Sequence, residues 1–308
     1  MPDITALGEL LIDYTPAGTS SRGMPLYEQN PGGAPANVLV TAARLGLSAA
    51  LIARVGRDGQ GDFLRRTLQR EGVDLLALSE DPAAPTTLAF VTLSETGERS
   101  FSFVRGADAA LAPAHIPTGL VEGSRVLHLG TLSMTGEPVR SATREAVKRA
   151  KAAGVPLSLD PNWRPLLWPD EAAALPLMRE LLAAADFVKL SEEEAPLLTG
   201  EREPARAAAA VLGLGASLVA VTLGERGAYL ASRTASASVP AEPVEAVDST
   251  GAGDTFWGAA LVWLLRRFPA EAPLAPAAVA ALDAPALLAL GRFACGEAAR
   301  CVSHRGAF

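Results

Sequence analysis

The sequence contains few of the residues that form disulfides or metal centres. Only 2 of its 308 residues are cysteine and 3 are histidine. Cys295 and Cys301 lie near the end of the sequence and form no Cys-x-x-Cys pair. We therefore interpret both as reduced helix residues of a cytoplasmic protein, and we expect neither a disulfide scaffold nor a histidine–cysteine metal site.

Basic clusters and long apolar runs are also missing. The net charge is −7, and no lysine/arginine cluster is longer than a pair, so neither nucleic acid nor an anionic membrane is an expected partner. Residues 1–14 include acidic residues and no basic n-region, which disfavours a signal peptide. The longest strongly apolar run, residues 259–265, is far shorter than the roughly 20 residues that span a bilayer.

Several catalytic motifs are absent as well. The sequence has no Gly-x-x-x-x-Gly-Lys-Ser/Thr loop, no protein-kinase signature, no His-Glu-x-x-His and no Gly-x-Ser-x-Gly. If the protein transfers phosphoryl groups, it is therefore a kinase of neither the P-loop type nor the protein-kinase type.

What is present is an alternation of strand-like and helix-like segments in a chain that is 49% hydrophobic. This alternation predicts a three-layer α/β/α sandwich around a mostly parallel sheet. The predicted strands are residues 4–13, 49–55, 126–129, 156–159, 187–190 and 218–223. The predicted helices are residues 38–45, 61–71, 137–153, 171–185 and 202–212. Residues 227–232 and 237–240 are predicted to form a late antiparallel pair.

Residues 86–106 interrupt the alternation. Two β-rich runs, 87–93 and 100–104, flank a turn that contains glycine, which predicts a β-hairpin. Residues 14–30, rich in glycine, serine and proline, are candidates for further strands. We therefore expect one domain over residues 1–308, with a small β-sheet lid formed by about 14–30 and 86–106.

The most informative stretch is residues 248–258. Gly251 and Gly253 precede Asp254, and an apolar helix-like run follows. Glycines allow backbone N–H groups to approach a ligand, and a helix start adds free donors, so this corner suits an anion. A carboxylate there is explained if it takes a proton from a nucleophile while the amides hold a phosphate. The alternative is a tight turn with Asp254 as helix N-cap.

Two other segments offer partners for a polyol. Gly32 and Gly33 precede a predicted helix that carries Asn37, whose amide both donates and accepts. Asp13 ends the first predicted strand, where a carboxylate can accept hydrogen bonds from two sugar hydroxyls. The alternatives are a turn with Asn37 facing solvent and a strand-ending turn at Asp13.

Asp160, Asn162 and Arg164 alternate after another predicted strand, and Arg164 could reach a phosphate. A proline-rich loop with a structural ion pair is the alternative. Ser191 and Glu194 have the spacing of a capping box, although Glu194 could also orient magnesium-bound water. Residues 222–227 suit either a loop beneath a nucleotide or a plain β-turn.

Together these segments resemble the ribokinase-like (PfkB-type) carbohydrate kinase family over nearly the whole chain. Gly32, Gly33 and Asn37 are similar to its N-terminal signature, residues 55–61 to the segment after it, and residues 248–254 to its C-terminal signature. Within the family the likeness is closest to fructokinases, through residues 86–91, 98–103, 105–108 and 160–168. The last segment is shared with 2-keto-3-deoxygluconate kinases.

The resemblance implies an ATP- and magnesium-dependent sugar kinase. Asp254 would be the base, and Gly251, Ala252 and Gly253 would form the anion hole. The implied sugar-binding residues are Asp13, Gly32, Gly33, Asn37, Phe103, Arg105, Asp160, Asn162 and Arg164. The implied nucleotide-binding residues are Lys189, Ser191, Thr222, Gly224 and Gly227. Glu194 would hold magnesium through water, and backbone carbonyls at Asp248 and Thr250 could hold potassium. Ser191 replaces the family's usual asparagine, which leaves that asparagine's role open.

Four hypotheses stay open at this point. The first is phosphorylation of fructose, with the 6-phosphate as the family's product, although the sequence does not show the regiochemistry. A 2-keto-3-deoxygluconate kinase would need a cation for the substrate carboxylate, for which Arg105 is the candidate. A nucleoside kinase would need lid aromatics such as Phe101 and Phe103. A non-catalytic sugar- or nucleotide-binding protein is disfavoured by the intact Asp254. The lid could also pair with a partner's lid in a homodimer.

Overall fold

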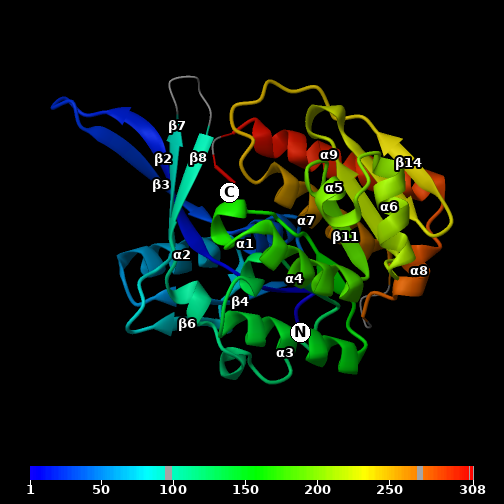
Figure 1. Cartoon of the computed structure of the whole chain (residues 1–308), viewed down its shortest axis with the longest axis horizontal. Coiled ribbons are helices and arrows are strands. Elements are labelled where there is room, and N and C mark those ends of the chain that lie inside the picture. The colour runs from blue at the N-terminus through cyan, green and yellow to red at the C-terminus, as the bar shows by residue number, and fades with distance from the viewer. Residues whose placement is uncertain (94–98, 269–272, 305, 308) are drawn as a thin grey trace.

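The computed structural model describes residues 1–93, 99–268, 273–304 and 306–307, and in these ranges ten strands form one large sheet (Figure 1). The strand order is β14-β13-β12-β11-β10-β9-β1-β4-β5, with β6 paired to β4. All pairs are parallel except those of β13, which runs antiparallel to both neighbours. The strands are β1 (Ile4–Leu7), β4 (Ala49–Gly56), β5 (Val73–Asp74), β6 (Leu78–Asp81), β9 (Val126–Leu129), β10 (Leu157–Leu159), β11 (Phe187–Ser191), β12 (Leu218–Thr222), β13 (Ala228–Ser232) and β14 (Ser236–Val239).

Helices cover both faces of this sheet, which confirms the predicted three-layer sandwich. Successive strand residues point to opposite faces, so Leu51 and Ile52 of β4 enter two separate buried clusters. The first cluster contains residues from α1 (Ala34–Arg44), α2 (Gly59–Arg70), α7 (Ala252–Arg267), α8 (Pro276–Ala280) and α9 (Ala284–Val302). The second contains residues from α3 (Val139–Ala153), α4 (Glu171–Ala184), α5 (Glu194–Thr199) and α6 (Pro204–Gly213).

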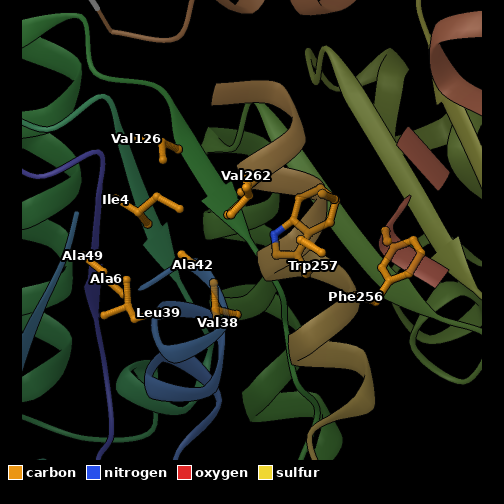
Figure 2. Close-up of a cluster of buried hydrophobic side chains, with 14 of the residues drawn as sticks. Ile4, Ala6, Val38, Leu39, Ala42, Ala49, Val126, Phe256, Trp257 and Val262 are labelled. Carbon is orange, nitrogen blue, oxygen red and sulfur yellow. The ribbon is translucent and has the colours of Figure 1, made fainter. Parts of the chain in front are cut away.

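Figure 2 shows part of the first cluster, where side chains of α1 and α7 meet those of β1, β4 and β9. Trp257 is fully buried there, one turn after Asp254 on α7. Packing around Trp257 therefore fixes the start of α7 against the sheet. Within the described ranges, no helix combines the length and hydrophobicity needed to cross a bilayer.

A second, four-stranded sheet stands beside the sandwich (Figure 1). Its order is β3-β2-β7-β8, formed by β2 (Leu11–Thr19), β3 (Pro25–Gly32), β7 (Leu88–Leu93) and β8 (Arg99–Val104). The antiparallel pairing of β7 with β8 confirms the predicted hairpin. Its turn, residues 94–98, lies outside the described residues, as does the side chain of Phe101.

The prediction of one strand over residues 4–13 is wrong. β1 ends at Leu7 in the large sheet, and β2 begins at Leu11 in the small sheet. The chain passes between the sheets at Gly8, where a Cβ would lie 2.5 Å from the Cγ of Pro35. The hydrophobic run continues across this break because both strands are buried, so apolar patterning gave no boundary. Asp13 consequently lies on the small sheet, and Glu9 follows the carboxyl end of β1.

The small sheet is tied to the sandwich by a carboxylate. Asp58 is the N-cap of α2 and accepts a hydrogen bond from the Gly61 N–H at 2.8 Å. It also accepts from the backbone N–H of Thr86 at 2.8 Å and from the Thr86 hydroxyl at 2.7 Å. Thr86 leads into β7, so the start of a helix in the sandwich anchors the entry to the second sheet.

Candidate active site

A cavity of about 580 Å³ lies where the carboxyl ends of β1, β10 and β11 face the small sheet and the start of α7. Ligands of open α/β sheets bind at this edge. Most residues predicted for the site line it: Asp13, Gly33, Asn37, Phe103, Asn162, Arg164, Lys189, Ser191, Glu194, Asp248, Thr250, Gly251, Gly253 and Asp254. Segments from four parts of the sequence are thus brought together as expected.

The other predicted residues do not line this cavity. Gly32 lies behind Asp13, since a Cβ at Gly32 would lie 2.1 Å from the Asp13 Oδ2. Arg105 pairs with Asp108 at 2.8 Å and donates to the Thr135 hydroxyl at 3.2 Å, so its guanidinium is engaged at the base of the small sheet.

The three residues predicted beneath a nucleotide lie one strand further along the same edge. Thr222 ends β12 and pairs in register with Ser191 of β11. Gly224 and Gly227 have φ values of 59° and 94°, in the left-handed region that favours glycine. A Cβ at Gly227 would lie 2.0 Å from the carbonyl oxygen of Val239, so this turn packs closely against β14.

Asp254 lies in the first turn of α7 and is buried, with 8% of its surface exposed. The Nδ2 of Asn37 donates a hydrogen bond to its Oδ2 at 2.7 Å. Burial, together with the negative charge of Asp160, raises the pKa of Asp254 to about 7, against the lowering effect of Asn37, Lys189 and Arg164. A carboxylate with this pKa is suited to accept a proton near neutral pH.

The start of α7 offers N–H donors beside Asp254. Gly251 is the N-cap, with a left-handed φ of 75°, and a Cβ there would lie 2.6 Å from the Ala307 Cβ. Ala252 already donates to the Ser249 carbonyl at 3.3 Å, so its predicted place in the anion hole is partly taken. Within the described part of the chain, the N–H groups of Gly251 and Gly253 have no such acceptor. These two are the available donors for an anion.

Lys189 and Asp160 form a buried ion pair close to Asp254. Their Nζ and Oδ2 atoms are 2.9 Å apart, with side-chain exposures of 8% and 1%. Burial alone would lower the pKa of Lys189, but the charges of Asp160, Glu194 and Asp254 outweigh it and hold that pKa above its ordinary value. Asp160, predicted to bind sugar, therefore contacts Lys189 and does not line the cavity.

Ser191 and Glu194 form the predicted capping box. The Ser191 N–H donates to the Oε2 of Glu194 at 2.7 Å, and the Glu194 N–H donates to the Ser191 hydroxyl at 3.1 Å. The Oε1 of Glu194 accepts from the Trp163 N–H at 2.8 Å. Both carboxylate oxygens thus have a backbone donor. No cluster of three or more carboxylate, histidine or cysteine ligands occurs among the described residues.

Asp248 fixes the glycine-rich turn. Its Oδ1 accepts from the N–H and hydroxyl of Thr250 at 2.9 and 2.7 Å, and its Oδ2 accepts from the Gly306 N–H at 3.1 Å. The side chain is thereby used within the protein, and the Thr250 carbonyl accepts a hydrogen bond from the Cys301 thiol at 3.6 Å.

The opposite wall of the cavity carries two carboxyl groups and a guanidinium. Burial raises the pKa of Asp13 to about 6, while the charge of Arg164 opposes that shift. Arg164 is exposed on the cavity side and also lowers the pKa of Asp254. Glu9, which sequence reasoning missed, lines the cavity as well. The sequence marks Glu9 only as a single carboxylate within the apolar run, residues 4–13, that is predicted to be one strand.

A buried carboxylate with a raised pKa, N–H groups without an acceptor among the described residues and a polar cavity thus lie together at the start of α7. A sequence model described as pfkB family carbohydrate kinase matches residues 1–305. The chain belongs to this family and is a carbohydrate kinase.

Named relatives lie close to the chain in both sequence and structure. Fructokinase-2 of Zea mays is 42% identical over 266 residues, which cover 84% of this chain and 79% of that protein. Fructokinase-1 of Oryza sativa subsp. japonica is 41% identical, covering 86% and 82%. The fructokinase of Xylella fastidiosa with bound ATP has a TM-score of 0.90 at 33% identity, covering 100% and 94%. The fructokinase of Vibrio cholerae O395 bound to fructose, ADP and calcium has a TM-score of 0.84 at 34% identity, with the same coverage.

The buried ion pair leads to a stability prediction. In Lys189→Met, Asp160 would remain buried without its cation, and we expect the free energy of unfolding to fall by about 3–5 kcal/mol. Adding Asp160→Asn to Lys189→Met should recover part of this loss, because the uncompensated charge is then removed. Urea unfolding monitored by circular dichroism measures both effects.

Lys148→Met is the matched control, since that side chain is 81% exposed and its partner Glu145 lies 4.0 Å away. It should change the free energy of unfolding by less than about 0.5 kcal/mol. Equal effects of the two lysine substitutions would contradict the assignment of Lys189 as the essential buried counter-charge.

Proposed function

We propose that the protein is a fructokinase, which transfers the γ-phosphate of ATP to a hydroxyl of fructose, with fructose 6-phosphate as the product. The observation that carries the proposal is Asp254, a buried carboxylate with a pKa of about 7, beside the N–H groups of Gly251 and Gly253, which have no acceptor among the described residues. The names of the relatives at about 40% identity support fructose as the acceptor.

Asp254 is the proposed general base. Its Oδ2 is held by Asn37, which leaves Oδ1 to take the proton of the sugar hydroxyl. The N–H groups of Gly251 and Gly253 then stabilise the charge that develops on the phosphoryl oxygens. Positioning and charge stabilisation supply most of the catalysis in phosphoryl transfer, and both come here from one helix start.

The proposed sugar contacts are made by other residues that line the cavity with Asp254. The Oδ1 of Asn37 is buried and has no hydrogen-bond partner among the described residues, so it is available to a hydroxyl donor. Asp13, Gly33 and Arg164 line the same cavity, and the charge of Arg164 lowers the pKa of both Asp13 and Asp254. The small sheet acts as a lid that excludes water, which would otherwise accept the phosphoryl group.

ATP is the proposed phosphate donor, with its nucleotide along the strand ends at Ser191, Thr222, Gly224 and Gly227. Magnesium, held through water by Glu194, supplies neutralisation of phosphate charge when it is bound. Backbone carbonyls of Asp248 and Thr250 are the proposed ligands for potassium. A double mutant of the Vibrio cholerae O395 fructokinase, one of the similar solved structures, has fructose, ADP and potassium bound.

The competing substrate, 2-keto-3-deoxygluconate, carries a carboxylate that needs a cation. Arg105 was the candidate, but its guanidinium is paired with Asp108 and bonded to Thr135. Because the guanidinium of Arg105 is already used within the protein, the proposal favours fructose, a neutral sugar, over 2-keto-3-deoxygluconate.

The substrate is tested by ADP release with ATP and magnesium across fructose, 2-keto-3-deoxygluconate, ribose, adenosine and no sugar. We expect turnover dominated by fructose. Turnover on 2-keto-3-deoxygluconate would leave the assignment of Asp254 as the base unchanged, but it would show that fructose is not the substrate. Sugar binding without any turnover would support the non-catalytic alternative.

Asp254→Asn tests the base. The amide keeps the shape of the side chain but cannot take a proton, so we expect kcat to fall by about 10²–10⁴-fold while fructose binding persists. Asp62→Asn, at an exposed position of α2, is the control and should behave as wild type. Near-normal kcat in Asp254→Asn would remove the base assignment.

The pH dependence follows from the same group. Because the base must be unprotonated, kcat/KM for fructose should rise about tenfold per pH unit below the Asp254 pKa of about 7 and level off above it. Initial rates from pH 5 to 9 measure this profile. A flat profile across pH 7 in wild type would show that proton transfer to Asp254 does not limit the reaction.

A further inference from the structure

Glu9 lies in the short connection between the two sheets, directly after β1, and only 8% of its surface is exposed. Its Oε1 accepts a hydrogen bond from the Ala34 N–H at 3.1 Å, in the first turn of α1. Its Oε2 is buried and has no hydrogen-bond partner among the described residues. Glu9 is one of the residues that line the cavity, so a donor that the protein does not supply can come from a ligand bound there.

The charges around Glu9 do not supply the missing partner. Burial raises the pKa of Glu9 to about 7, and its own backbone N–H opposes that shift; the charge of Asp108 adds to it, and the charge of Arg105 and the N–H of Ala34 oppose it. Arg105 and Asp108 are already paired with each other at 2.8 Å, so the guanidinium is committed. A buried acceptor without a donor is destabilising, and the cavity is the side from which a donor can come.

We propose that the Oε2 of Glu9 accepts a hydrogen bond from a hydroxyl of the bound sugar and selects for a neutral polyhydroxy substrate. This inference rests on the proposed sugar kinase function and deepens it. Glu9 acts with the Oδ1 of Asn37, the other buried side-chain acceptor without a partner in the described ranges that lines the same cavity. A sugar with donor hydroxyls completes both acceptors, whereas a substrate carboxylate brings no donor and adds negative charge.

Glu9→Gln separates this role from a structural one. Glutamine can keep the carbonyl oxygen that accepts from Ala34, and it replaces the free Oε2 with an N–H₂ donor. We expect the Kd for fructose, measured by calorimetry with a non-hydrolysable ATP analogue, to rise about 10–100-fold, the loss expected for a charge-assisted hydrogen bond. The KM for ATP and the melting temperature should stay close to wild type. Glu122→Gln, at an exposed position that does not line the cavity, is the matched control.

A panel of 1-deoxy-, 3-deoxy- and 4-deoxyfructose identifies the hydroxyl. One analogue should bind wild type more weakly than fructose by a similar factor, and Glu9→Gln should no longer distinguish it from fructose. The inference is overturned if Glu9→Gln binds fructose as wild type does, or if its affinity falls equally for fructose and every analogue.

The outcome is distinguishable from failure of the proposed function. If wild type phosphorylates another neutral sugar, fructose is wrong, yet the coupling between Glu9 and that sugar's deoxy analogues still decides the inference. If the substrate is a sugar acid, both the fructokinase proposal and the role of Glu9 fail.

Discussion

Lys189 is the buried cation that balances the carboxylates of Asp160, Glu194 and Asp254 at the carboxyl edge of the sheet. Lys189 makes its direct contact with Asp160. Its charge therefore cancels only part of the increase in the pKa of Asp254 that burial causes. A free lysine against Asp254 would hold that carboxylate ionised and make it a weak base. Without the charge of Lys189, the pKa of Asp254 would be higher still. The ion pair therefore sets the basicity of the site between these extremes.

The sheet produces this arrangement through its register. Ser158 pairs with Phe187 and Leu159 with Val188, so Asp160 and Lys189 come next in line on adjacent parallel strands. The indole N–H of Trp257 donates to the Ser158 hydroxyl at 2.8 Å, which ties α7 to the same strand. Asp254 is one turn earlier on α7. Asp254 and its counter-charges are thus positioned around β10, by the contact of Trp257 with Ser158 and by Asp160, which directly follows the strand.

Features that depend on neighbouring residues could be predicted from the sequence, and those that depend on distant pairs could not. The glycines before Asp254 and the Ser191–Glu194 capping box are local, and the hairpin was marked by its turn residues. The hydrogen bond between Asn37 and Asp254 joins residues 217 positions apart, and the contact of Lys189 with Asp160 joins residues 29 apart. The spacing of neighbouring residues in the sequence therefore predicts neither of these two contacts. Glu9 was hidden because buried apolar residues stand on both sides of the break between β1 and β2, where Gly8 packs against Pro35.

The cavity keeps two buried acceptors, the Oε2 of Glu9 and the Oδ1 of Asn37, without donors among the described residues. Leaving such a group unpaired against a bound ligand costs about 1–3 kcal/mol, so a ligand that supplies hydroxyl donors binds more favourably than one that does not. A ligand without donors leaves both acceptors unpaired and gains nothing from them. Sites that require a hydrogen bond from the substrate reject analogues lacking it far more strongly than apolar pockets reject a missing methylene. The proposed selectivity for a polyol thus rests on these two acceptors, while the proposed transfer of the proton rests on the raised pKa of Asp254.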